Sequence, residues 1–150
     1  MRYAEDYPKG EHYDLGEHKV TADEIIQFGR TYDPQPYHID EKLGRDSVFG
    51  GLIASGWNTC GIWMKLYVTT LLSDAAVEGS PGVDEIRFLL PVRPGDVLHG
   101  TAEIAGAAPS FSDPGVVIIK NKGELIRGDG QTVLILTLSS RFRKRGNGAG

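Results

Sequence analysis

The sequence has only one cysteine, Cys60, so no disulfide can form within one chain. Cys60 lies in an apolar stretch, where a free cysteine usually packs as a small hydrophobic side chain. The histidines at 12, 18 and 99 are scattered and lack the spacing and cysteine partners of a zinc site, so no bound metal is expected. Residues 1–14 hold no apolar run, which argues against a signal peptide and favours a cytoplasmic protein. A net charge of −4 disfavours a general nucleic-acid binder.

The length of 150 residues fits one domain, 1–150, with enough chain to bury a core. Hydrophobic residues make up 40% and charged residues 24%, which is ordinary for a globular protein. We expect the packed part to span about 12–142. The tail, 143–150, is basic and then glycine-rich and is expected to be flexible.

The longest apolar run covers residues 50–72 and has Lys65 as its only charged residue. Its length would allow a membrane span. Its glycines and its polar residues, such as Asn58, argue against that interpretation, so membrane association is not expected. A pair of buried strands is a second alternative. We favour a third, a central helix that is apolar nearly all round and is therefore covered by other elements.

The flanking segments predict short helices before this run and strands after it. Thr21 and Glu24 have the spacing of a capping box, which predicts a helix over 22–31, with Pro34 ending it. A first strand is expected at 13–20. Later strands are expected at 82–90, 97–105, 116–126 and 132–142, with a loop at 106–115. Because a sheet has to cover the central helix, the predicted class is α+β.

Two features near the helix suggest chemistry. Asp33 and His38 place an acid and an imidazole five residues apart, in a loop that contains two prolines. Gly50 and Gly51 come at the expected start of the helix, where free backbone N–H groups and the positive end of the helix dipole can stabilise an oxyanion. The alternative for each is structural: a capping Asp, a packed His and a tight turn.

Three motifs together resemble the MaoC-like dehydratases, which are related to the (R)-specific enoyl-CoA hydratases. They are Asp-Pro-Gln-Pro-Tyr-His-Ile-Asp at 33–40, Phe-Gly-Gly-Leu-Ile-Ala-Ser-Gly-Trp at 49–57 and Pro-Val-Arg-Pro-Gly-Asp at 91–96. The resemblance covers about 20–142. It implies a hot-dog fold, in which an antiparallel sheet wraps around one long helix at about 50–72. It also implies a homodimer or higher oligomer with the active site at the subunit interface.

The resemblance implies roles for individual residues. Asp33 and His38 match the pair that holds and activates water. Gly50 and Gly51 match the backbone group that polarises the thioester carbonyl, and Ser55 matches a small residue near the acyl chain. Other substrate-binding candidates are Gln35, Tyr37, Phe49 and Trp57. Gln35 stands where the family commonly has Asn. The glycine before the helix is often preceded by His in the hydratases, and here the preceding residue is Gly50.

The predicted function is therefore an acyl-thioester hydratase or dehydratase acting at the 2,3 double bond. The substrate is expected to be carried on coenzyme A or acyl carrier protein, with no other cofactor. One alternative is a hot-dog thioesterase, which is weakened because no Asp or Glu occurs in 50–72. The other is a non-catalytic acyl-thioester-binding dimer.

Overall fold

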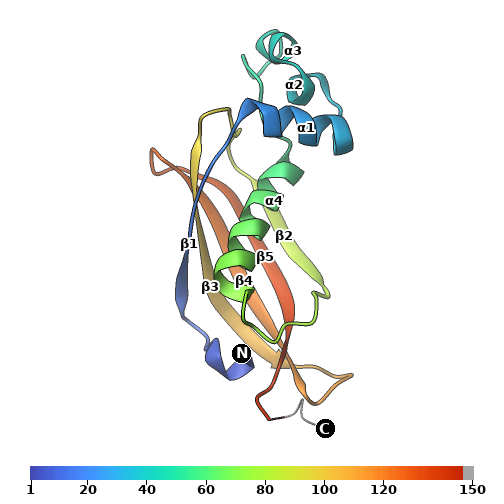
Figure 1. Ribbon diagram of the computed structural model, residues 1–150, viewed down its shortest axis with the longest axis vertical. Coiled ribbons are helices and arrows are strands. Elements are labelled where there is room, and N and C mark those ends of the chain that lie inside the picture. Colours follow the sequence, from blue (N-terminus) through green and yellow to red (C-terminus); the bar gives the residue numbers. More distant parts are fainter. Residues whose placement is uncertain (147–150) are drawn as a thin grey trace.

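A five-stranded antiparallel sheet forms one face of the molecule and wraps around a central helix, as the computed structural model shows for residues 1–146 (Figure 1). The strands are β1 (His12–Lys19), β2 (Gly82–Phe88), β3 (Val97–Pro109), β4 (Val116–Arg127) and β5 (Thr132–Arg143). Their order in the sheet is β1-β3-β4-β5-β2, so β1 and β2 are the two edges. The predicted class and the hot-dog architecture are confirmed. β3 runs to Pro109 and takes in part of the segment expected to be a loop.

Three helices gather at one end of the sheet, above the start of the central helix (Figure 1). They are α1 (Ala22–Tyr32), α2 (Pro36–Ile39) and α3 (Glu41–Arg45), and a short 3-10 helix, η1 (Ala4–Asp6), precedes β1. The capping box predicted for α1 is present, because Thr21 Oγ1 accepts a hydrogen bond from the Glu24 N–H and the Glu24 carboxylate accepts one from the Thr21 N–H. The predicted helix is confirmed to within one residue.

The central helix, α4 (Gly56–Tyr67), continues as one π-helical segment, η2 (Val68–Leu72). The predicted start at Gly50 was wrong by six residues. Gly50 has a left-handed backbone conformation, with φ +65°. It ends a turn that is closed by a hydrogen bond from its N–H to Ser47 O. The next residues then run extended, because Ile53 N–H donates to Tyr37 O and Ala54 N–H donates to Val92 O. These buried apolar residues belong to the core but not to the helix.

The core lies between α4 and the concave face of the sheet. Inward side chains alternate along β3 and β5, as predicted, and bury Leu98, Ala102, Ile104, Leu134, Leu136 and Leu138. From α4, Trp63 stacks on Tyr67 with ring centroids 4.6 Å apart, and Trp63 Nε1 donates to Thr101 O at 3.0 Å. Gly123 of β4 lies directly under the Trp63 ring and leaves no room for a β-carbon. A large aromatic pair therefore fills the space between helix and sheet.

Two further predictions concerned a flexible tail and membrane association. The part of the tail that the structure describes makes defined contacts: Arg143 ends β5 and forms an ion pair with Glu78 at 2.6 Å, and Arg145 contacts Asp6. Residues 147–150 lie outside the described part. Within residues 1–146, no helix is both long enough and apolar enough to cross a membrane.

Candidate active site

The loop after α1 brings Asp33 and His38 to the N-terminal end of α4. Asp33 caps the C-terminus of α1, and its N–H donates to Gly29 O at 2.8 Å. Pro36 then opens α2, a position that suits proline because the first N–H groups of a helix have no internal partner. This single turn carries His38 back toward the carboxylate. A β-carbon at Gly29 would lie 2.6 Å from His38 O, so the glycine lets α1 and α2 approach closely.

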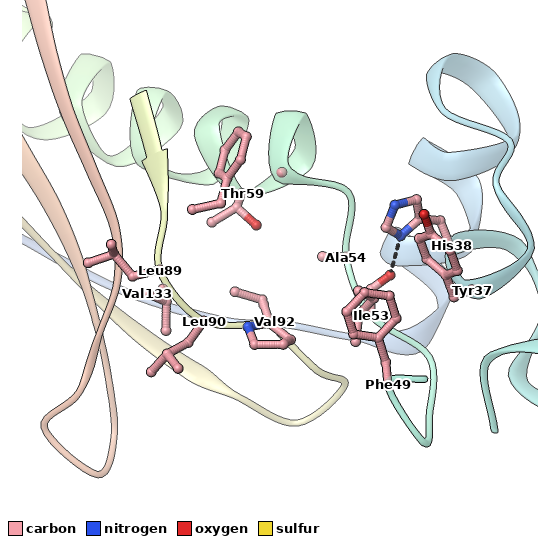
Figure 2. Close-up of a pocket in the computed structure, with 13 residues that line it drawn as sticks. Tyr37, His38, Phe49, Ile53, Ala54, Thr59, Leu89, Leu90, Val92 and Val133 are labelled. Carbon is pink, nitrogen blue, oxygen red and sulfur yellow. Dashed lines mark hydrogen bonds between the residues drawn. The ribbon is translucent and has the colours of Figure 1, made fainter. Parts of the chain in front are cut away.

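His38 faces Asp33 in a defined tautomer. His38 is only 5% exposed, and its Nδ1 lies 2.7 Å from the backbone oxygen of Ile53 (Figure 2). Because a carbonyl oxygen can only accept, Nδ1 carries the hydrogen. In the neutral ring Nε2 is therefore a free acceptor, and it lies 3.4 Å from Asp33 Oδ2. The pair predicted from the sequence is brought together, with a lone pair on each side of the gap.

A chain of hydrogen bonds fixes the Asp33 carboxylate. Ser55 Oγ donates to Oδ2 at 2.7 Å, and Gln35 Nε2 donates to Oδ1 at 2.8 Å. Gln35 is itself held by the Tyr37 hydroxyl, which donates to its side-chain oxygen. Partial burial acts to raise the pKa of Asp33, but the hydrogen bonds from Ser55 and Gln35 outweigh it and lower the pKa below its usual value; the charge of His38, when its ring is protonated, adds to the lowering. The carboxylate is therefore held in its ionised form.

An apolar cavity of about 320 Å³ lies beside His38, between the start of α4 and the segment after β2 (Figure 2). Tyr37 and Phe49 form part of its wall near His38, with their ring centroids 5.0 Å apart. The opposite part is lined by Thr59 of α4 and by aliphatic side chains, among them Leu89, Leu90, Val92 and Val133. Such a lining suits an apolar group that has its reactive end at His38.

Several predicted site residues lie elsewhere. Gly50 and Gly51 are in the turn before the extended segment and not at the helix start, which begins at Gly56; their oxyanion role stays a prediction. Ser55 is 0% exposed and does not line the cavity; it caps α4 and contacts Asp33. Trp57 is 60% exposed and also lies outside the cavity lining, with its ring edge-on to Phe88.

Sequence reasoning missed two groups that the structure places at the site. The first is Gly56, which begins α4 and lines the cavity. The second is the backbone oxygen of Ile53, which orients His38. The Ser-Gly pair at 55–56 was a usable signal for the first, since serine is a favoured N-cap. No sequence signal marks the second.

Metal ligands are not gathered at the site. Across the described chain, 1–146, no three His, Cys, Asp or Glu side chains come close enough to hold an ion. Cys60 is partly buried, and burial raises the pKa of its thiol to about 11. Its thiolate is therefore scarce at neutral pH, and the thiol is a poor ligand or nucleophile.

The antiparallel sheet around one helix, with an acid–imidazole pair at the helix start, defines a hot-dog protein of the dehydratase type. The chain belongs to the MaoC-like family, because the family model described as MaoC like domain matches residues 6–124.

Known proteins agree with this assignment. A solved structure, the MaoC-like dehydratase from Rhodospirillum rubrum, is 37% identical with a TM-score of 0.86 and covers 96% of this chain and 99% of its own. The (R)-specific enoyl-CoA hydratase of Rhodospirillum rubrum is 27% identical over 109 residues, which are 73% of this chain and 74% of that protein. An uncharacterised Bacillus subtilis protein, YdeM, is 31% identical over 102 residues, or 67% of this chain and 72% of its own.

Proposed function

We propose that this protein is a hydratase or dehydratase that adds water to, or removes it from, the 2,3 double bond of an acyl thioester. The observation that carries the proposal is the pair of acceptors, His38 Nε2 and Asp33 Oδ2, 3.4 Å apart next to an apolar cavity. A water molecule has two hydrogens to donate, one to each acceptor. Its oxygen lone pair then points away from the pair and toward a substrate in the cavity.

The two side chains take different parts in the reaction. In hydration, His38 Nε2 removes a proton from water as the oxygen bonds to C3, and the electrons of the double bond move toward the thioester carbonyl. The imidazolium then returns a proton to C2, so the enzyme ends unchanged. Asp33 remains ionised, orients the water and stabilises the imidazolium. Its lowered pKa and its three polar neighbours support this role.

The negative charge that develops on the carbonyl oxygen needs a hydrogen-bond donor, and we assign this role to the backbone N–H of Gly56. The Gly56 N–H has no hydrogen-bond partner within residues 1–146, and Gly56 lines the cavity. As the first residue of α4, it also stands at the positive end of the helix dipole. A preorganised backbone donor of this kind stabilises an oxyanion without reorganising during the reaction.

The details of the site favour catalysis over the rival functions. Gln35 is one methylene longer than the Asn common in the family, yet it reaches Asp33 at 2.8 Å, so the substitution does not argue for a decayed binding site. A hot-dog thioesterase would use a carboxylate on the central helix, and α4 and η2 contain none. We therefore favour the hydratase or dehydratase over the thioesterase and the non-catalytic binding protein.

The proposal includes an assembly and a setting. Phe88 and Leu89 line the cavity, and β2, which Phe88 ends, is an exposed edge strand. A second copy paired along this edge would cover both an open strand and the cavity wall, and so we propose a homodimer.

We further propose a cytoplasmic enzyme whose substrate is carried on coenzyme A or acyl carrier protein. The proposed hydration and dehydration steps need no metal or redox cofactor.

The test is hydration of crotonyl-CoA, followed by loss of absorbance of the conjugated thioester. Asp33→Asn and His38→Gln should each lower kcat by roughly 100-fold or more, and the double variant should lose little beyond the worse single one. His99→Gln is the matched control, since His99 pairs with Asp14 at 3.1 Å on β3 and β1, away from the cavity. Full turnover in both single variants would contradict the site. Release of free coenzyme A without hydration would favour the thioesterase.

A further inference from the structure

Tyr37 is linked to the imidazole of His38 in two ways. Its backbone oxygen accepts the Ile53 N–H at 3.0 Å, and the Ile53 oxygen in turn accepts the hydrogen of His38 Nδ1 at 2.7 Å. Its ring stands edge-on to the His38 ring, with ring centroids 4.6 Å apart, and lies beside Phe49 in the cavity wall (Figure 2). The Tyr37 ring is therefore held in a fixed position relative to the imidazole.

The Gln35 side chain connects the Tyr37 hydroxyl to Asp33. An ionised carboxylate can only accept hydrogen bonds, so the end of the Gln35 amide that lies 2.8 Å from Asp33 Oδ1 is Nε2. The amide oxygen is then free to accept the hydrogen of the Tyr37 hydroxyl. Turning the amide over would set its oxygen against the carboxylate. The phenol therefore favours the orientation in which Gln35 donates to Asp33.

Gln35 depends on this support because its side chain is exposed. Ordering a long amide side chain costs rotamer freedom, which the contacts of the side chain have to offset. Gln35 precedes α2, but within residues 1–146 its side chain makes no capping hydrogen bond to that helix. Asn is a favoured residue for such a cap, whereas Gln is not. The contacts that order the Gln35 amide are its hydrogen bonds to Asp33 and Tyr37.

We propose that Tyr37 is a positioning residue for the hydration reaction, whose hydroxyl acts through Gln35 to hold the Asp33 carboxylate where it faces His38. This inference rests on the proposed function. Without the hydroxyl, the Gln35 amide is free to rotate, and Asp33 keeps only the side-chain hydrogen bond from Ser55. The carboxylate then orients the attacking water less well. The hydroxyl itself touches neither the substrate nor the water.

The first test is kinetic and uses crotonyl-CoA. Tyr37→Phe keeps the ring in the cavity wall and removes only the hydroxyl. We expect kcat to fall by about tenfold, the effect of one lost hydrogen bond, while KM stays nearly unchanged. Tyr13→Phe is the matched control, because the Tyr13 hydroxyl donates to Glu11 and Tyr13 lies on β1, at the sheet edge opposite β2. It should keep the kcat of the wild type. Full kcat in Tyr37→Phe would overturn the inference.

A double variant shows whether the hydroxyl acts through Gln35. Gln35→Met keeps an unbranched side chain of similar length but has no amide, and it should lower kcat about as much as Tyr37→Phe does. Combining the two changes should cost little more than either alone, because both break the same chain of hydrogen bonds. A further tenfold loss in the double variant would mean that the hydroxyl acts directly on the substrate or the water, and this result would also overturn the inference.

NMR titration of the Asp33 carboxyl separates this inference from the proposed function. Against the effect of partial burial, hydrogen bonds lower the pKa of Asp33, and the Gln35 amide supplies one of them. The titratable side chain that faces Asp33, His38, is present in every variant. The pKa of Asp33 should therefore rise in Tyr37→Phe and in Gln35→Met and keep its wild-type value in Tyr13→Phe.

The two readouts fail separately. If the wild type hydrates crotonyl-CoA but the pKa of Asp33 and kcat are the same in Tyr37→Phe, the inference fails alone. If the wild type does not hydrate crotonyl-CoA, the proposed function fails. A raised pKa of Asp33 in Tyr37→Phe would then still support the link from the hydroxyl to the carboxylate, and an unchanged pKa would overturn it.

Discussion

Ser55 Oγ donates a 2.7 Å hydrogen bond to Oδ2 of Asp33, a residue 22 positions earlier in the chain. The same oxygen accepts the Trp57 N–H at 3.3 Å and so caps α4. One buried hydroxyl therefore joins the start of the central helix to the carboxylate that faces His38. Because the cap fixes Ser55, the Asp33 carboxylate is aligned by the backbone of α4.

Replacing Ser55 should affect folding and catalysis together. Ser55→Ala removes the cap, which should destabilise the fold by about 1 kcal/mol in a urea titration. It also frees Asp33 Oδ2, and we expect kcat for enoyl-CoA hydration to fall by at least about tenfold. Thr21→Ala is the control, because Thr21 caps α1 in the same way without touching Asp33. It should lose similar stability and keep its kcat; equal kcat in the two variants would mean that Ser55 only caps the helix.

Gly56 should tolerate no side chain. A β-carbon there would lie 2.5 Å from the Phe88 ring, which lines the cavity. Gly56→Ala should therefore push Phe88 aside and lower kcat/KM by about 100-fold, since small displacements at reacting centres have effects of this size. Adding Phe88→Ala should restore part of the loss by making room.

Gly51→Ala gives the comparison for the oxyanion assignment. Its β-carbon would lie 3.0 Å from Arg93 Nη1, the end of a flexible side chain that can move. We expect this variant to stay folded and nearly as active as the wild type in the same absorbance assay. An inactive, folded Gly51→Ala together with an active Gly56→Ala would return the oxyanion role to the glycine predicted from the sequence.

The lowered pKa of Asp33 predicts how stability depends on pH. A carboxyl with a lower pKa in the folded state stabilises the fold above its unfolded pKa of about 3.9, and the contribution disappears as pH falls through the folded value. The free energy of unfolding of the wild type minus that of Asp33→Asn should be constant near pH 5 and should decrease below about pH 4. Urea titrations at pH 3, 4 and 5 measure this difference. A difference that increases toward acid would contradict the lowered pKa.

The exposed edge at β2 predicts a dimer. Pairing of two copies along this strand would satisfy its outer backbone groups and cover the exposed Val83, Phe88 and Leu89. Light scattering should give the mass of a dimer across a hundredfold range of concentration. Val83→Asp should weaken the dimer strongly. Val83→Thr is the milder control and should weaken it far less. A monomeric wild type would refute the assembly.

The sequence by itself determined the class of fold and the acid–imidazole pair. Alternation along 132–142 identified a half-buried strand, and the box at Thr21 and Glu24 located α1, because both signals come from neighbours along the chain. Pro34 and Pro36 likewise restrict the backbone locally, so that Asp33 and His38 could be recognised as one loop.

Tertiary structure alone decided where the central helix begins and what holds the pair. Apolar residues at 52–54 are buried in either conformation, so hydrophobicity cannot tell an extended segment from a helical turn. The choice follows from the hydrogen bonds of Ile53 and Ala54 to Tyr37 and Val92, residues distant in sequence. The same extended segment offers Ile53 O to His38, and the late helix start makes Ser55 the cap that reaches Asp33. Such contacts depend on how separate segments pack, so they cannot be predicted from composition or from the spacing of residues.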